Sequence, residues 1–250
     1  IEDIRFCVKD NKGCIGRINQ TKTLSCLQNP EVGCEQIERD GSYAPAVVKK
    51  KVLVVGGGPA GLEAARVAQE RGHEVLLYEK APFLGGQVNL IRKRPGRQPM
   101  AGIIQHLINA LKKIEVSVTT AMEVNPELVL QMNPDVVIVA TGSRPRESPV
   151  PGEYGPPWVL NVWEALSGAH AVGQRVLFVD ENGGHHASAT VELFADQGKK
   201  VTMVTSDLFI GIELAPLGDL YLTRQRLLQK GVTFMTDVLI DHIAGDKVLG

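Results

Sequence analysis

The hexapeptide Gly-Gly-Gly-Pro-Ala-Gly at residues 56–61 restricts the fold of this chain more than any other feature. It lies between the β-branched run 51–55 and a segment, 62–72, whose apolar residues recur at helical spacing. A second apolar run at 74–79 completes a strand–helix–strand unit. A crossover of this kind requires parallel strands and a right-handed connection. The segment therefore predicts an α/β fold with a parallel sheet.

The glycines of this unit have the spacing of a dinucleotide-binding loop. Gly56, Gly58 and Gly61 form the pattern GxGxxG between a predicted strand and a predicted helix, which is the context that the pattern requires. The first glycine permits a tight turn, the second lets the backbone approach a pyrophosphate, and the third lets the helix pack on the strand. The helix N-terminus offers unpaired N–H groups to the phosphates. Glu79, at the end of the second strand, can accept hydrogen bonds from an adenosine ribose. The loop therefore predicts a dinucleotide or ADP site.

The rest of the chain repeats the same plan. After a Pro/Gly-rich joint at 145–157, a second strand–glycine loop–helix–strand series begins. The fold class predicted is α/β, with tandem doubly wound, Rossmann-like FAD/NAD(P)-binding halves behind an irregular N-terminal segment. We expect a Cys-rich segment and linker at 1–49, a FAD/ADP-binding half at 50–150, and a second, NAD(P)-like half at 151–250. The remaining predicted elements are a helix at 103–113, strands at 115–120, 135–140 and 175–180, a helix at 187–198, a strand at 200–205, a helix at 217–230, and two short strands joined by a turn within 232–243.

The loop of the second half departs from the glycine pattern. Alignment of the two helices places three residues at the glycine positions: Asn182, Gly184 and Ala187. Asparagine at the first position weakens the tight turn, and His185 and His186 fill the phosphate approach. The following strand ends without the acid expected for a ribose hydroxyl. These departures disfavour NADH and leave NADPH open, because Ser206 could meet a 2′-phosphate.

The cysteines are confined to the start of the chain, at Cys7, Cys14, Cys26 and Cys34. The N-terminus lacks the apolar stretch of a signal peptide, which disfavours a disulfide framework and predicts a cytoplasmic protein. We favour a metal or cluster site at these cysteines, and the alternative is a loop of unrelated reduced thiols.

Charge and hydropathy disfavour two classes of partner. The chain has 27 Lys and Arg against 28 Asp and Glu, for a formal net charge of −1. This balance gives no general attraction to nucleic acid or to an anionic membrane. No uninterrupted apolar run approaches the ~18 residues of a membrane-spanning helix. We therefore expect neither a nucleic-acid partner nor a membrane partner.

Two further motifs carry a resemblance to a known fold. Gly85-Gly86-Gln87 follows Glu79, and Ala140-Thr141-Gly142 closes the last strand of the first half. With the GxGxxG loop they resemble the two-dinucleotide-binding flavoproteins of the pyridine-nucleotide–disulfide reductase fold, in which such elements border FAD. No cysteine follows Cys34, so the dithiol chemistry of a thiol reductase is excluded. The cofactor-binding set that we expect is Gly56, Gly57, Gly58, Pro59, Ala60, Gly61, Glu79, Lys80, Gly85, Gly86, Gln87, Arg97, Val124, Ala140, Thr141 and Gly142.

The cysteine-rich start and the tandem halves together make a more specific match. They are similar to the C-terminal part of the iron–sulfur flavoenzymes, the old yellow enzyme-like family of 2,4-dienoyl-CoA reductase and trimethylamine dehydrogenase. The resemblance runs through essentially the whole chain. It implies an FMN-binding TIM barrel before the first residue and a return segment after the last one.

The resemblance also implies a ligand set for a 4Fe–4S cluster. The family motif is C-x2-C-x3-C-x11-C, and Cys7, Cys14 and Cys26 match its first, third and fourth positions, whereas Asp10 stands at the second. Four thiolates are the usual requirement, so an oxygen ligand implies a labile fourth iron or a three-iron cluster. Cys34, which lies past the motif, is the alternative fourth ligand.

The function implied by the resemblance is electron transfer between cofactors. In the dienoyl-CoA reductase type, NADPH reduces FAD and the cluster passes electrons to FMN in the barrel. In the amine dehydrogenase or demethylase type, electrons leave FMN through the cluster for an external electron-transfer flavoprotein, and ADP occupies the FAD site. The chain is thus expected to be the FAD- or ADP- and cluster-carrying portion of such an oxidoreductase, with any homo-oligomer formed through the full-length enzyme. A non-redox ADP-binding structural module and a stand-alone NAD(P)H:acceptor diaphorase remain as alternatives.

Overall fold

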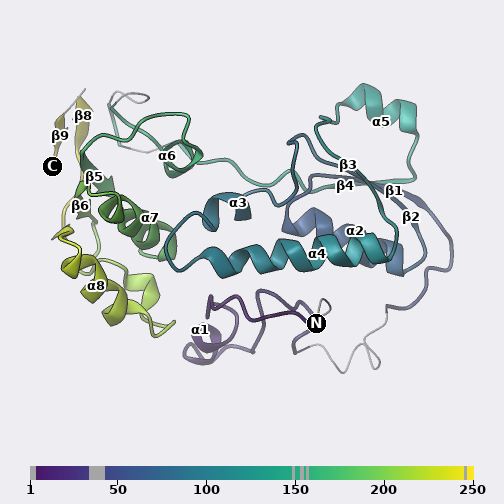
Figure 1. Ribbon diagram of the computed structural model, residues 1–250, viewed down its shortest axis with the longest axis horizontal. Coiled ribbons are helices and arrows are strands. Elements are labelled where there is room, and N and C mark those ends of the chain that lie inside the picture. The colour runs from purple at the N-terminus through teal and green to yellow at the C-terminus, as the bar shows by residue number, and fades with distance from the viewer. Residues whose placement is uncertain (1–3, 34–42, 148–149, 153–154, 156–157, 245–246) are drawn as a thin grey trace. The chain divides into compact units, whose positions relative to one another are not determined.

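The computed structural model describes residues 4–33, 43–147, 150–152, 155, 158–244 and 247–250 (Figure 1). The chain divides into two compact units. The first comprises Ile1–Asp10, Leu24–Asn89 and Pro99–Ser143, and the second comprises Asn11–Thr23, Leu90–Gln98 and Arg144–Gly250. The N-terminal segment therefore contributes to both units. The domain boundaries that we expect at residues 50 and 151 divide the chain into continuous ranges of sequence, and they stay a prediction.

A four-stranded parallel sheet forms the centre of the first unit, in the order β3-β2-β1-β4. Its pairing runs from Lys51 with Glu74 to Val55 with Tyr78, which gives the predicted strand–helix–strand unit its parallel strands. The three central residues of β1 are buried, as expected for a strand covered on both faces. The strands are β1 (Lys51–Val55), β2 (Glu74–Tyr78), β3 (Ser117–Thr119) and β4 (Val136–Val139).

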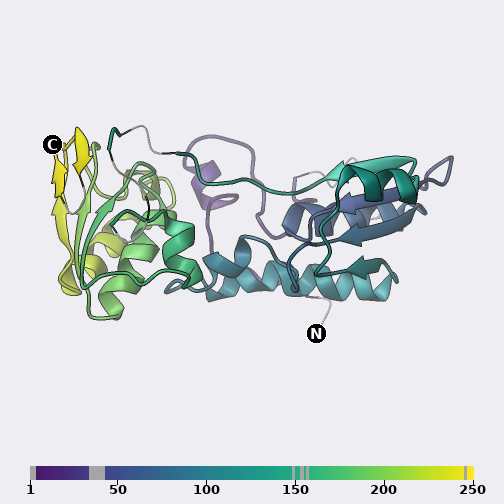
Figure 2. The same cartoon turned by 90° about the horizontal axis from the view of Figure 1, so that it is seen from above.

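The helices of the first unit cover this sheet. Helix α2 (Pro59–Glu70) packs on β1 and β2, and α4 (Ala101–Lys113) lies alongside α2 (Figures 1 and 2). Each helix buries apolar residues spaced three or four apart, such as Leu107 and Leu111 of α4. The short elements α3 (Val88–Ile91), η1 (Gln98–Met100) and α5 (Pro126–Met132) complete the helices between β2 and β4.

The N-terminal segment is held to both units by side-chain hydrogen bonds. In the first unit, Arg5 Nε donates to His106 Nε2 of α4 at 2.8 Å. In the second unit, the short helix α1 (Ile15–Ile18) is followed by Asn19, whose side-chain amide donates to the carbonyl of Pro216 at 2.7 Å. The irregular segment is thus packed on each unit that it contributes to.

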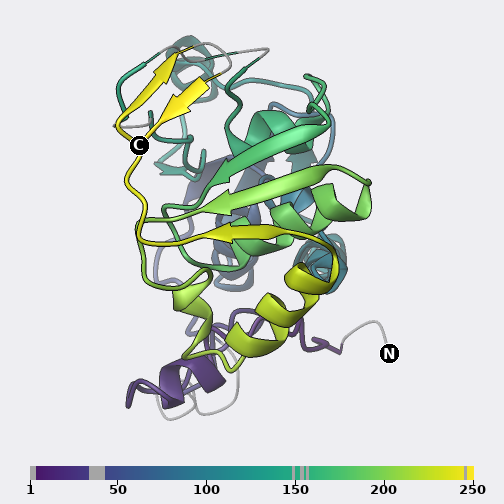
Figure 3. The same ribbon diagram turned by 90° about the vertical axis from the view of Figure 1, so that its left-hand side faces the viewer.

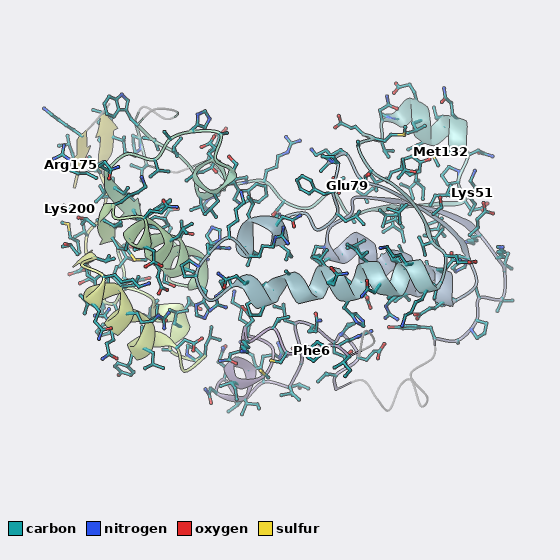
Figure 4. The ribbon with its side chains drawn as sticks, in the orientation of Figure 1. Phe6, Lys51, Glu79, Met132, Arg175 and Lys200 are labelled. Atoms are coloured by element: carbon teal, nitrogen blue, oxygen red, sulfur yellow. The ribbon has the colours of Figure 1, made fainter. Side chains whose placement is uncertain are left out.

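A three-stranded parallel sheet, in the order β5-β6-β7, forms the centre of the second unit (Figure 3). Its strands are β5 (Arg175–Val179), β6 (Lys200–Val204) and β7 (Thr233–Met235). Arg175 and Lys200, the first residues of β5 and β6, are paired in register and are both labelled in Figure 4. Two parallel sheets with helical crossovers confirm the predicted α/β fold with tandem Rossmann-like halves.

A buried apolar cluster joins the helices of the second unit to its sheet. Val191 and Phe194 of α7 (His185–Asp196) pack with Met203 of β6 and Leu227 of α8 (Leu220–Gln229). The other helical elements are α6 (Val162–Ser167) and η2 (Ile212–Leu214). None of the helices within the described ranges is both long and apolar enough to cross a membrane.

The prediction for residues 232–243 is partly wrong. Two short strands do form in this region, but a turn does not join them into a hairpin. β7 pairs in parallel with β6, and β8 (His242–Ala244) pairs in antiparallel fashion with β9 (Lys247–Leu249). Both are strands of three residues, and β-propensity does not specify which partner a short strand will take. Residues 245–246, between β8 and β9, lie outside the described residues.

Candidate functional site

The first glycine loop is shaped by two close backbone approaches. Gly56 has φ +115°, and a Cβ at this position would collide with the carbonyl of Ala140. A Cβ at Gly61 would collide with the carbonyl of Gly56, where the first turn of α2 passes over the strand end. Only glycine satisfies both constraints, because each leaves no room for a side chain. The loop therefore has the turn and helix packing expected of the first and third glycines.

Gly58 differs from its neighbours because space is open around it. It is the N-cap of α2, and a Cβ built there would have no heavy atom within 4 Å. The first residues of a helix have N–H groups without helical partners, and the helix dipole is positive at this end. Pro59, the first residue of α2, already lacks an N–H, and Ala60 is exposed. Open space beside these amides is the geometry that an anionic phosphate needs.

Glu79 is buried at the carboxyl end of the sheet and tied to the glycine loop. Its Oε2 accepts from the N–H of Gly57 at 2.6 Å, and its Oε1 accepts from the N–H of Ala81 at 2.7 Å. Figure 4 shows Glu79 at this end of the sheet, with Lys51, the first residue of β1, at the other. An ionised carboxylate has about four lone-pair positions, so two remain for ribose hydroxyls.

Two further loops meet the first at this edge. The N–H of Gly85 donates to the carbonyl of Gly57 at 2.8 Å, and a Cβ on Gly86 would lie 3.2 Å from Cα of Gly58. The side-chain amide of Gln87 donates to the hydroxyl of Ser143 at 2.9 Å. The structure therefore brings the loops 56–61, 85–87 and 140–143 together.

The remaining predicted contacts are placed less closely. Lys80 is exposed and adjacent to Glu79. Val124 is half-buried, and Met122, two residues before it, donates its N–H to the carbonyl of Glu79 at 3.1 Å. Arg97 lies in the segment that packs with the second unit. Their contact with a cofactor stays a prediction.

The second loop has a carboxylate where the first has a glycine. Asp180 follows β5 directly and is 2% exposed. Its Oδ1 accepts from the N–H groups of Asn182 at 3.0 Å and of Gly183 at 2.9 Å. Burial raises the pKa of Asp180, and the charges of Asp207 and Glu181 raise it further, against the lowering effect of these hydrogen bonds. Backbone amides that could bind a phosphate are thus occupied by an acid.

The two histidines of this loop are engaged within the second unit. His185 Nε2 lies 2.8 Å from Oδ2 of Asp219. Buried Arg94 donates from Nη1 to the carbonyl of His186 at 2.8 Å. Burial lowers the pKa of His186, and the charges of Arg94 and Lys12 lower it further, so His186 is neutral at neutral pH. The first residues of α7 are thus held by partners from other segments of the second unit.

Sequence reasoning missed Asp180, and the missed signal was an acid directly after a strand. In a dinucleotide-binding half, a glycine begins the turn at this point, as Gly56 does after β1. Alignment on the helices placed Asn182 at that glycine position instead and passed over the residue at the strand end.

The four predicted cluster ligands do not converge within the described residues. Cys7, Cys14 and Cys26 are free thiols, and Cys7 and Cys26 are exposed, whereas Asp10 is buried. In the part of the chain that the structure describes, no three Cys, His, Asp or Glu side chains are close enough to share a metal ion. Cys34 lies outside the described residues. As placed, these side chains do not form a cluster site, so the ligand set stays a prediction.

Comparison with known proteins identifies the family. Residues 50–249 match the model of the pyridine nucleotide-disulphide oxidoreductases. The chain belongs to this family. The match spans both Rossmann-like halves and confirms the resemblance seen in the glycine loops.

Several curated members of the family are similar to most of the chain. Bilirubin reductase of Mediterraneibacter gnavus is 39% identical over 201 residues, which cover 80% of this chain and 30% of that protein. N,N-dimethylglycine/sarcosine dehydrogenase of Chromohalobacter salexigens is 37% identical over 246 residues, which cover 96% of this chain and 35% of that protein. The chain thus spans about a third of the length of these relatives.

Solved structures of larger enzymes share the fold. Histamine dehydrogenase from Rhizobium sp. 4-9 has a TM-score of 0.91 at 27% identity, and the match covers 99% of this chain and 40% of that one. A 2-naphthoyl-CoA reductase has a TM-score of 0.88 at 32% identity, covering 99% of this chain and 37% of that one. These relatives are flavin-dependent oxidoreductases, the family's domain binds FAD, and related enzymes carry 4Fe–4S and FMN.

Proposed function

We propose that this chain is the FAD-binding, electron-transferring part of a larger flavin-dependent oxidoreductase. The open space over Gly58 carries the proposal. It stands at a helix N-terminus, between glycines that have no such space, and beside a buried acid. This is the arrangement that the pyrophosphate and ribose of a dinucleotide require.

The residues of the first unit fit FAD, and each has a defined task. The amides at the start of α2 would bind the pyrophosphate, and Glu79 would accept from the ribose hydroxyls while keeping its bond to Gly57. The Gly85–Gln87 loop and the end of β4 would border the rest of the cofactor. Bound FAD would supply the capacity to accept and release electrons. The protein supplies the position of the cofactor and the hydrogen bonds around it.

The loop of the second half disfavours binding of NAD(P)H, so we infer that the electrons come from another source. Asp180 engages the amides of Asn182 and Gly183 and brings a carboxyl to the place where a pyrophosphate would lie. The negative charge of this carboxylate would repel an anionic dinucleotide, and the N–H groups that would bind its phosphates are already occupied. This observation disfavours a stand-alone NAD(P)H:acceptor diaphorase.

The chain matches only about a third of the length of these relatives, which supports a multidomain enzyme. We propose that the whole protein adds an FMN-binding TIM barrel, works in the cytoplasm, and exchanges electrons with substrate at FMN or with an external electron-transfer flavoprotein. Any homo-oligomer would form through the whole enzyme. Chain coverage of about a third of each relative supports this division of labour.

A substitution at Gly58 tests the proposal directly. Gly58→Ala adds a methyl group in open space at φ −78°, so the apo fold should tolerate it, whereas the methyl group should obstruct the phosphate. We expect the affinity for FAD to fall by about tenfold or more. Gly173→Ala is the matched control. Gly173 belongs to the second unit, and the nearest heavy atom to a Cβ built there would lie 3.8 Å away.

The measurement is FAD titration of the purified apo chain by fluorescence, with identification of any nucleotide released from the chain as isolated. Unchanged FAD affinity in Gly58→Ala, or absence of FAD binding by the unmodified chain, would contradict the proposal. Isolation of bound ADP with no affinity for FAD would instead identify the non-redox structural module.

A further inference from the structure

The loop between β5 and α7 contains a pair of residues that can react with each other. Asn182 is followed by Gly183, and this is the only asparagine–glycine pair in the sequence. In such a pair the backbone nitrogen of the glycine can attack the side-chain amide of the asparagine, because glycine has no Cβ to hinder the approach and has the freest backbone. The proposed binding of FAD in the first unit makes no use of this loop.

The reaction converts the asparagine into an acid in two steps. In the first, a bond forms between the nitrogen of Gly183 and Cγ of Asn182, the bond from Cγ to Nδ2 breaks, and ammonia leaves with the proton of the attacking N–H. In the second, water opens the resulting cyclic imide at either carbonyl and gives aspartate or isoaspartate. No group is oxidised or reduced, and water is the only co-reactant. Asparagine counts among the thermolabile residues of proteins.

The side chain of Asn182 is placed favourably for the first step. The residue is exposed, and a Cβ built at Gly184 would lie 2.9 Å from its Oδ1. The side-chain amide is therefore turned toward the backbone that follows it, which includes the attacking nitrogen. Beside the loop, Asp180 and Glu181 line a cavity of about 280 Å³ where β5 and β6 end. Liquid water occupies about 30 Å³ per molecule, so this cavity has room for the water of the second step.

The backbone of Gly183 is held in a way that opposes the reaction. Its N–H donates to Oδ1 of Asp180 at 2.9 Å, and its carbonyl accepts from the N–H of Glu213 at 3.0 Å. Gly183 is buried, and a Cβ there would lie 2.9 Å from Cγ2 of Ile212. The nitrogen can attack only after its N–H is released, because this proton leaves in the first step. The rate of a reaction that needs such an opening follows the population of the open form.

The charge of Asp180 strengthens this protection. Asp180 is 2% exposed, and a hydrogen bond to an ionised acceptor is roughly twice as strong as one to a neutral acceptor. A carboxylate beside the nitrogen also disfavours the negative charge that develops there as the proton leaves. Burial raises the pKa of Asp180, so the reaction is best followed at mildly alkaline pH, where the carboxyl is ionised.

We propose that Asn182 is a site of spontaneous deamidation and that Asp180 controls its rate through the hydrogen bond from Gly183. The product adds a carboxylate next to Glu181, and its isoaspartyl form lengthens the backbone by a methylene group. The reaction therefore changes the loop of the second half irreversibly. The loop belongs to the second unit and the proposed FAD site to the first, so this proposal stands or fails independently of FAD binding.

Peptide mapping of the whole chain by mass spectrometry tests this inference. The chain is incubated at mildly alkaline pH, either folded in buffer or unfolded in guanidinium chloride, and sampled over weeks. In the unfolded chain, Asn182 should deamidate faster than the exposed Asn161, because Asn161 is followed by the β-branched Val162. In the folded chain, we expect Asn182 to deamidate at least about tenfold more slowly, since a hydrogen bond to a charged acceptor must break first.

Two variants assign the protection to Asp180. Asp180→Asn keeps an oxygen that can accept from Gly183 and removes the charge, so Asn182 in the folded chain should deamidate about threefold faster or more. Glu181→Gln is the matched control, because it removes the same charge from the neighbouring, exposed side chain, and should change the rate less than about twofold. Circular dichroism verifies the fold of each variant.

Hydrogen exchange of the unmodified chain covers the case in which Asp180→Asn fails to fold. The N–H of Gly183 should exchange at least about tenfold more slowly than in the unfolded chain, and mild denaturant should speed this exchange and the deamidation of Asn182 by the same factor. Four outcomes would each overturn the proposal: equal deamidation in the folded and unfolded chains, no deamidation at Asn182 in the unfolded chain, no effect of a folded Asp180→Asn, or an equal effect of Glu181→Gln.

Discussion

The glycines of the first loop meet two different physical demands. Gly56 and Gly61 are required by the protein itself, because a Cβ on either would strike a backbone carbonyl. Gly58 faces open space, so the fold alone does not require it to be glycine. The φ of Gly58, −78°, is also accessible to other residues, so neither the backbone conformation nor the space within the fold requires a glycine there.

A single residue, Asp180, gives the second loop a different pattern of hydrogen bonds from the first. A glycine after β1 leaves the amides of the first loop facing open space, whereas an aspartate after β5 turns the amides of the second loop inward. The same supersecondary plan therefore leaves open space at the start of α2 in one unit and a buried acid in the loop before α7 in the other.

The predicted cluster ligands can be tested one residue at a time. After anaerobic reconstitution with iron and sulfide, we expect the chain to bind iron, Cys14→Ser to lose most of it, and Cys34→Ser to retain it. The reason is that Cys14 occupies a position of the motif and Cys34 lies past it. Asp10→Cys should yield a cluster that survives longer in air, because thiolate binds iron more tightly than carboxylate.

Iron and sulfide analysis with EPR measures these outcomes. An iron-free chain after reconstitution, or equal loss of iron in Cys14→Ser and Cys34→Ser, would show that the ligand set is wrong. Since the described side chains do not converge, iron binding would also require the N-terminal segment to rearrange.

At the scale of elements, one buried acid joins the two long helices of the second unit. Glu192 of α7 accepts from Arg226 Nε of α8 at 3.2 Å and from Lys230 Nζ, just past α8, at 2.9 Å. Burial acts to raise the pKa of Glu192, but the hydrogen bonds and charges of its two partners outweigh burial and lower it. The ionised form is therefore the one that the fold stabilises.

This gives a pH-dependent prediction for stability. A depressed carboxyl pKa stabilises the fold above the ordinary carboxyl pKa of 4.5, and that stabilisation is lost as the pH falls through the folded value. We expect Glu192→Gln to lower the free energy of unfolding at neutral pH by about 1 kcal/mol, and the difference to disappear in acid. Urea unfolding at a series of pH values measures it. The exposed Glu213→Gln serves as control, and an equal loss in both variants would contradict the assignment.

Strand pairing is the element-scale feature that sequence patterns predicted least well. The strands at 51–55 and 74–79 were predictable because a helix of known length connects them. β7 and β8 are both strands of three residues, yet one extends a parallel sheet and the other forms an antiparallel pair. β6, the partner of β7, lies before α8, whereas β9, the partner of β8, is the next strand along the chain, and local propensity does not distinguish these outcomes.

At the scale of the whole molecule, the two halves have the same plan and different sites. The first has three loops meeting around Gly58, and the second has a closed loop beside an acidic cavity. Division of tasks between similar halves is common because function depends on the site and not on the fold.

The difference predicts how the chain responds to reduced pyridine nucleotides. When the FAD-loaded chain is mixed anaerobically with NADH or NADPH, we expect the flavin absorbance to persist over minutes, because the amides of the second loop are occupied by Asp180. Dithionite should bleach the same sample and is the positive control. Rapid bleaching by either nucleotide would contradict this account and favour the diaphorase.

The sequence by itself determined the features that depend on neighbours along the chain. The parallel strand–helix–strand unit, the glycines of the first loop and the acid at the end of β2 follow from local spacing, since a turn and a helix start are set by nearby residues. Only the tertiary structure decided which loops meet at Gly58, that β7 extends the sheet beside β6, and that Asp180 lines a cavity. These features depend on contacts between residues far apart in the chain, and their energies come from burial and hydrogen bonding that exist only once the sheet edges have formed.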